Sequence, residues 1–191
     1  MVDTELLIRT ALECGADKAV IIEEKDIVTD PSFREMCAAN RCRTYGKCYM
    51  CPPDCGEVDE LTARLRSYPN ALFYQKVTNL DDHFDFEGMI RARREFGKLS
   101  QKMMTACGPL VGPDALHLSV GGCGVCDVCA KVTGEPCRFP DRAISSLEAY
   151  VINVAGTCKN TELKYINGQD TVTYFGMILY DSENRQESST D

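Results

Sequence analysis

The sequence predicts an α+β fold of about four strands interleaved with helices, with two cysteine-rich loops at one edge. Apolar residues recur at helical spacing in several segments, and short apolar runs bounded by turn residues lie between those segments. Nine of the twelve cysteines fall in two stretches that contain glycine and proline, residues 37–55 and 123–137. The 191 residues are enough for one domain with a real core, which we expect over residues 1–180. The polar segment 181–191 is expected to be a disordered tail.

The first predicted helix covers residues 4–14. Leu7 and Ala11 fall on one face of it, and Asp3 or Thr4 is placed to cap its first turn. A glycine follows the segment and is expected to stop the helix there.

Short apolar runs between turn residues predict four strands. These strands cover residues 19–22, 71–77, 115–120 and 174–180. Apolar residues at helical spacing predict the other helices, over residues 31–39, 57–68, 84–106 and 145–158.

Two of these helices rest on distinct signals. The segment 84–106 is the longest, and the sequence ACGPLVGP after it predicts a turn because it holds two glycines and two prolines. Ser145 with Glu148 three residues later resembles a capping box, which predicts that a helix begins there and presents one apolar face as far as Cys158.

Composition excludes several classes of protein. The net charge of −8 argues against binding nucleic acid through its phosphates, which requires a basic surface. No stretch approaches 18 apolar residues, and the start MVDTELLIRT lacks the apolar core of a signal peptide, so we expect no membrane span and a cytoplasmic location. In a reducing compartment, many cysteines indicate metal binding more than disulfides. Because oxygen destroys many metal clusters that are exposed to solvent, an anaerobic host is a reasonable hypothesis.

Motifs of common enzymes are missing from the sequence. It contains no GxSxG, no Walker loop and no GxGxxG. A radical S-adenosylmethionine enzyme would show CxxxCxxC, whereas Cys48, Cys51 and Cys55 run in the reverse order, CxxCxxxC. This pattern therefore argues against a radical enzyme.

The segment GGCGVCDVCAKVTGEPCRFP carries the strongest signal for a cofactor. Three cysteines follow one another at three-residue steps, and a fourth comes after a short loop, with a proline just beyond. This spacing is typical of an iron–sulfur cluster, whereas structural zinc sites usually combine two separate CxxC pairs. We predict a [4Fe-4S] cluster here, with zinc as the alternative, held by Cys123, Cys126, Cys129 and Cys137.

A second group of cysteines lies in the loop CAANRCRTYGKCYMCPPDCG. Its candidate metal ligands are Cys37, Cys42, Cys48, Cys51 and Cys55. A loop rich in proline and glycine lacks the apolar walls that surround core thiols, so we predict a second iron–sulfur cluster, again with zinc as the alternative. A four-iron cluster takes four protein ligands, so the five candidates leave the ligand set open.

The remaining cysteines and both histidines are expected to be structural. Cys14, Cys107 and Cys158 fall among apolar residues and are predicted to be buried thiols. His83 and His117 are far from every cysteine group in the sequence, and His117 is expected on the polar face of its strand.

The two cysteine motifs resemble those of a known family. The pattern C-x4-C-x2-YG-x4-CPP begins at Cys37, and the pattern CxxCxxC-x7-CRxP is followed by SSLEA at residues 145–149. Together they are similar to a family of small predicted metal-binding proteins of unknown function from methanogens and other anaerobes. The resemblance implies that three cysteines of the first group match the family pattern, namely Cys37, Cys42 and Cys51. A site with three cysteines would leave one iron open, whereas Cys48 or Cys55 as a fourth ligand would close it.

Three functions are consistent with these sites. The first is single-electron transfer between partner proteins, with Arg43, Lys47 and Arg138 as basic residues near a docking surface. The second is an enzyme or activation factor with an open-site cluster, serving a corrinoid- or nickel-dependent system. The third is a structural adaptor in a larger complex, in which the metal sites only hold the loops together.

Overall fold

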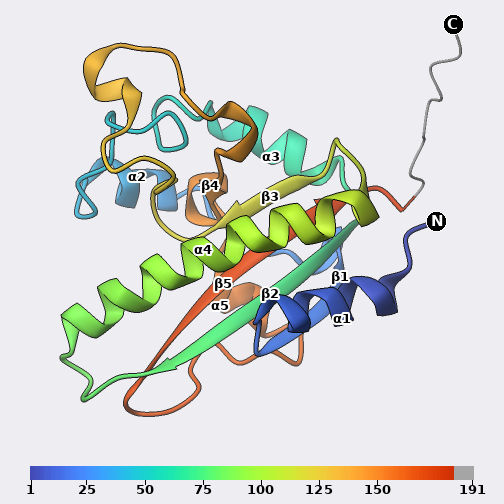
Figure 1. The fold of residues 1–191 in the computed structure, drawn as a ribbon. Helices are drawn as coiled ribbons and strands as arrows, with labels where there is room; N and C mark the ends of the chain where they lie inside the picture. Colours follow the sequence, from blue (N-terminus) through green and yellow to red (C-terminus); the bar gives the residue numbers. More distant parts are fainter. Residues whose placement is uncertain (183–191) are drawn as a thin grey trace, which may run out of the picture.

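One five-stranded sheet organises residues 1–182, the part of the chain that the computed structural model describes (Figure 1). In spatial order its strands are β1 (Lys18–Glu23), β2 (Asn70–Asn79), β5 (Thr171–Tyr180), β3 (Leu116–Ser119) and β4 (Ser145–Ser146). Neighbouring strands are antiparallel except for β3 and β4, which are parallel. The predicted α+β class and its four strands are confirmed, and β4 is an additional strand. The tail predicted from residue 181 lies, apart from its first two residues, outside the described part.

The described residues form five α-helices and four short 3-10 helices. The α-helices are α1 (Thr4–Cys14), α2 (Phe33–Ala38), α3 (Val58–Arg66), α4 (Phe86–Val111) and α5 (Val154–Cys158). The 3-10 helices are η1 (Glu24–Asp26), η2 (Ala130–Thr133), η3 (Pro140–Arg142) and η4 (Glu148–Tyr150). Within residues 1–182 no helix combines the length and the apolar character that crossing a bilayer requires.

The helices α1 and α4 cover one face of the sheet (Figure 1). Leu7 of α1 and Phe96 of α4 pack there against Leu72 and Tyr74 of β2. The side chain of Asp3 caps α1 as predicted, because its Oδ1 accepts the Leu6 amide at 2.9 Å.

The opposite face of the sheet packs on α3, α5 and η4. Leu65 of α3 and Ile152 meet Phe73 and Phe175 of the sheet in a second buried cluster. Strand β2 is therefore buried on both faces, which explains why its sequence ALFY is a continuous apolar run rather than an alternation.

Two helix predictions are corrected by the structure. Helix α4 continues through Pro109 to Val111, where the sequence predicted a turn. Pro109 has no backbone N–H, so the last turn of α4 lacks one hydrogen bond. Cys107 and Val111 on either side of it are buried in the core between α4 and the sheet, and their burial stabilises this turn. The segment predicted as a helix from Ser145 instead forms β4, η4 and α5, because Ser145 pairs with β3 and Val151 turns the chain at φ 53°.

The prediction for His117 as a residue on a polar face is also corrected. Its side chain in β3 is half-buried, and this burial lowers its pKa to about 4. His83 is exposed, with its Nδ1 3.8 Å from an oxygen of Asp170. Neither histidine lines a cavity that contains cysteine.

Gly176 of β5 leaves room for the side chain of Tyr74, which lies opposite it in the neighbouring strand β2. A Cβ at Gly176 would overlap the buried Tyr74 ring. We expect Gly176→Ala to lower the free energy of unfolding by about 3 kcal/mol, measured by denaturant titration of the anaerobic protein. Gly97→Ala in α4 is the matched control, because nothing lies within 4 Å of its added Cβ, and we expect it to stabilise the helix by about 1 kcal/mol. Equal effects of the two substitutions would contradict this account of β5.

Candidate metal centres

The two cysteine loops lie side by side beyond the end of β3 (Figure 1). Gly122 of the second loop lies against Thr44 and Cys51 of the first. A Cβ added to Gly122 would come within 3.3 Å of Thr44 Cγ2 and 3.8 Å of Cys51 Sγ, so the absence of a side chain at Gly122 lets the two loops pack closely. The Tyr49 hydroxyl also donates to the carbonyl of Glu135 at 2.8 Å. Segments far apart in the sequence therefore form one cysteine-rich lobe.

The smaller of two cavities in this lobe is surrounded by thiols from both loops. It has a volume of about 30 Å³ and is lined by Cys48, Cys123, Cys126, Cys129 and Cys137. All four cysteines of the CxxCxxC-x7-C motif thus face one small space, and Cys48 joins them from the other loop. At this volume the space has no room for a further organic molecule.

Backbone amides point at the sulfurs of this smaller cavity. Burial raises the pKa of the Cys123 thiol, and hydrogen bonds from the amides of Val125 and Ile144 oppose that effect. Gly124 permits the tight loop, since it has φ 69°, a conformation that side chains disfavour. The loop therefore already directs N–H groups at sulfur, which is how proteins stabilise thiolates that hold metal clusters.

Cys48 lies between the two cavities. The pKa of its thiol is lowered chiefly by a hydrogen bond with the Cys51 thiol, and further by the Cys123 amide and the Cys129 thiol. The same contact with Cys48 raises the pKa of Cys51. Cys48 therefore connects a thiol of the larger cavity to two residues of the smaller one.

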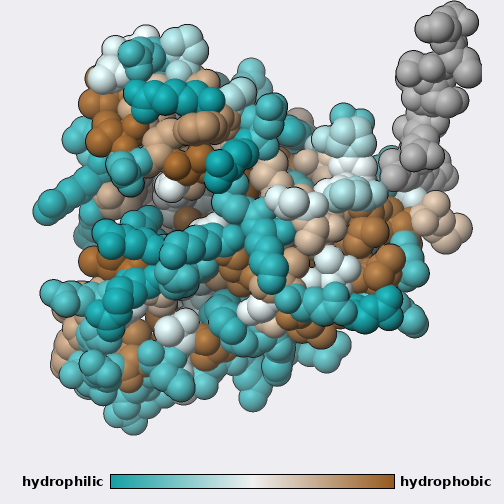
Figure 2. All heavy atoms as spheres, in the orientation of Figure 1, coloured by the Kyte–Doolittle hydropathy of each residue, from teal (hydrophilic) through white to brown (hydrophobic). Residues whose placement is uncertain are grey.

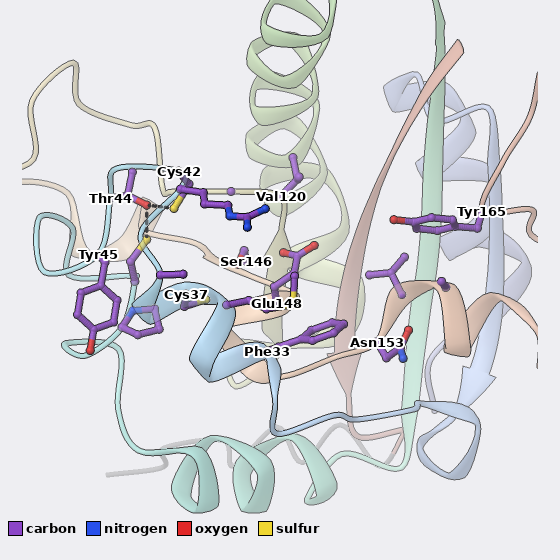
Figure 3. A pocket seen from close by; sticks show the side chains of 18 residues that line it. Phe33, Cys37, Cys42, Thr44, Tyr45, Val120, Ser146, Glu148, Asn153 and Tyr165 are labelled. Atoms are coloured by element: carbon purple, nitrogen blue, oxygen red, sulfur yellow. Dashed lines mark hydrogen bonds between the residues drawn. The ribbon is translucent and has the colours of Figure 1, made fainter. Parts of the chain in front are cut away.

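The larger cavity has a volume of about 630 Å³ and contains the other three cysteines of the family pattern (Figure 3). They are Cys37 at the end of α2, Cys42 and Cys51. The Sγ atoms of Cys42 and Cys51 lie 3.0 and 3.6 Å from Thr44 Oγ1. Burial raises the pKa of Cys37, as does the nearby Cys42 thiol. Three thiols are thus gathered on one wall of a hollow large enough for a small organic molecule.

A carboxyl group faces the same hollow. Figure 3 shows Glu148 in the middle of the view, with Cys42 on one side and Tyr165 on the other. Burial raises the pKa of Glu148, while hydrogen bonds from its own backbone amide and from the Ser146 hydroxyl oppose the rise. The charge of Glu148 in turn raises the pKa of Cys37. Among residues 1–182, no lysine, arginine or histidine forms an ion pair with this carboxyl.

Cys55 lines neither cavity. Its sulfur lies 3.9 Å from Arg34 Nη1 and packs against the core on the α3 side of the sheet. Cys107 and Cys158 are buried outside both cavities, as predicted, and burial raises their pKa values to about 12 and about 11. Cys14 is half-buried against α4.

Both cavities are lined by cysteine sulfur, which is the kind of donor atom that binds iron–sulfur clusters. Each cavity offers several soft thiols, and the smaller one adds backbone N–H groups aimed at sulfur. In the described part of the chain, no three histidine, cysteine, aspartate or glutamate side chains surround one point closely enough to hold a single ion.

Some residues of this site were not predicted from the sequence. Asn153 and Tyr165 line the larger cavity, but their sequence context carries no signal for a metal or a ligand, whereas Ser146, which also lines it, belongs to the SSLEA segment of the family resemblance. Glu148 was interpreted only as part of a capping box, although it lies within the SSLEA segment of the family resemblance. That segment was the one signal that could have placed Glu148 at the site.

Comparisons with known proteins agree with a metal site. A family model described as Predicted metal-binding protein (DUF2284) matches residues 20–180. No curated protein and no solved structure matches the chain. The matched range includes both cysteine loops and Glu148.

Proposed function

Because the chain belongs to this family of predicted metal-binding proteins, we propose that it holds two four-iron clusters and transfers single electrons. The observation that carries the proposal is the division of the cysteines between two adjacent cavities. The smaller cavity would hold a cluster through Cys123, Cys126, Cys129 and Cys137. The larger cavity would hold the other through Cys37, Cys42 and Cys51.

The protein's own groups suit electron transfer at the smaller cavity. A four-iron cluster supplies one-electron redox chemistry when it is bound. The amides of Val125 and Ile144 donate to the Cys123 sulfur, and such N–H···S bonds stabilise the more negative, reduced state.

Exposed apolar side chains around the smaller cavity support docking of a redox partner. Val128, Val132 and Phe139 are exposed on this loop, and Figure 2 shows hydrophobic side chains over the cysteine lobe at the upper left. Arg138, one of the basic residues expected at the docking surface, pairs with Glu135 at 2.9 Å. We therefore propose that apolar contacts dominate this surface.

The test of the proposal is the metal content and redox behaviour of the protein purified without oxygen. We expect about eight irons per chain, four for each cluster. Electron paramagnetic resonance should show a reversible one-electron signal on reduction. Zinc in place of iron would contradict the proposal, and clusters that never reduce would favour the structural adaptor.

The larger cavity favours a second candidate function, an enzyme or activation factor. Its volume of about 630 Å³ would leave space for a small molecule beside a cluster held by the three cysteines Cys37, Cys42 and Cys51. A resonance signal that changes when a substrate is added would support this function over simple electron transfer.

A further inference from the structure

We propose that Glu148 is the fourth ligand of the metal site formed by Cys37, Cys42 and Cys51. The inference rests on the proposed function, because it assumes that the larger cavity holds a four-iron cluster. It adds a ligand of a different chemical class, a carboxylate oxygen, to a set that would otherwise contain only thiols.

The position of Glu148 is the first argument. Its side chain lines the same cavity as the three thiols and lies toward the centre of that cavity in Figure 3. It is also close enough to Cys37 for its charge to act on that thiol. A cluster held by three cysteines on one wall would therefore present its remaining iron to the space that Glu148 faces.

The surroundings of the Glu148 carboxyl are the second argument. The side chain is half-buried, and its position is set by η4, directly after β4 and the buried Leu147. Within the described residues the carboxyl forms no ion pair, and its hydrogen-bond partners are its own backbone amide and the hydroxyl of Ser146. Carboxylates that are taken out of water are normally paired with a cation or bound to a metal. Arg41 lines the same cavity, but within the described residues it forms no ion pair with this carboxyl, which leaves the carboxyl available to an iron ion.

The alternatives among the protein's own side chains are weaker. Cys55 contacts Arg34 and lines neither cavity. Cys48 contacts the Cys51 thiol, but it lines the smaller cavity with the four motif cysteines and not the larger one. Glu148 is the one acidic residue that lines the larger cavity, and no histidine lines it.

The identity of this ligand has a chemical consequence. A carboxylate oxygen is a harder donor than a thiolate and suits iron less well than sulfur does. The iron next to Glu148 is therefore expected to be the one that exchanges most readily. The apolar side chains of Phe33, Val154 and Tyr165 border the same hollow and leave space beside that position.

The experiment compares four variants with the unchanged full chain, all loaded with 57Fe and sulfide without oxygen. In the unchanged protein we expect Mössbauer spectra to show one iron of about eight with oxygen coordination. Glu148→Gln removes the charge but keeps the shape, and should speed the oxidative loss of that iron at least about tenfold. Glu148→Cys should restore a firmly held iron with sulfur coordination. Glu35→Gln is the control, because Glu35 is exposed on α2 and lines neither cavity.

Failure of this inference can be separated from failure of the proposed function. If Glu148→Gln and Glu148→Cys both match the unchanged protein while Cys42→Ser lowers the iron content, Glu148 is not a ligand but the cluster exists. If Cys42→Ser leaves the iron content unchanged, the cluster in the larger cavity is itself wrong. Glu148→Cys preserves the test if Glu148→Gln folds poorly, since an unchanged oxygen-coordinated iron in the cysteine variant also overturns the inference.

Discussion

Replacing Cys126 by serine is expected to halve the iron content, from about eight to about four irons per chain. Cys126 is the middle residue of CxxCxxC and lines the smaller cavity with the other three motif cysteines. A serine hydroxyl remains protonated at neutral pH and is a poor ligand for iron. The melting temperature should fall as well, because metal binding to the native loop contributes to folding.

The control for this substitution is Cys14→Ser. Cys14 is a half-buried thiol on α1 and lines neither cavity. Its replacement by serine makes the same change of sulfur to oxygen at a position outside both sites. Iron analysis and circular dichroism should be measured on both variants without oxygen. An unchanged iron content in the folded Cys126→Ser protein would overturn the assignment of the smaller cavity.

The second large effect is expected for Cys42→Ser, which should remove the other half of the iron. Cys42 is exposed and lines the larger cavity, and its sulfur lies 3.0 Å from Thr44 Oγ1. The remaining cluster should still give the reversible one-electron signal, because the smaller cavity is lined by other cysteines. Integrated resonance intensity and iron per chain measure both parts of this expectation.

Cys55→Ser is the matched control for Cys42→Ser, since both residues belong to the same loop. Cys55 lies beside Arg34 and lines neither cavity, although its thiol is close enough to Cys37 to act on it, so its replacement should leave about eight irons in place. If Cys55→Ser lost iron and Cys42→Ser did not, the division of thiols described by the structure would not apply to the loaded protein.

The regular elements of the fold were largely predictable from the sequence. The helix α1 carries apolar residues at a helical period, and strand β5 contains a continuous apolar run that ends at a polar residue, so their existence followed from local pattern. The prediction was wrong between Ser145 and Cys158, where apolar residues at helical spacing instead belong to three short elements. There the pairing of β4 with β3, a long-range contact, overrides the local preference.

The sequence by itself determined that the chain carries two groups of cysteines with a metal-binding pattern. Type and spacing of ligands are local properties, so the segment from Cys123 to Cys137 could be interpreted without a structure. The family match to a predicted metal-binding protein agrees with that interpretation.

Only the tertiary structure decided which side chain faces which cavity. Cys48 and Cys51 are three residues apart, yet Cys48 lines the smaller cavity and Cys51 the larger one. Glu148 lines the same cavity as Cys37, although the two residues are more than a hundred positions apart in the sequence. The physical reason is that irregular loops have no repeating period, so the direction of each side chain depends on contacts with distant segments rather than on its neighbours in the sequence.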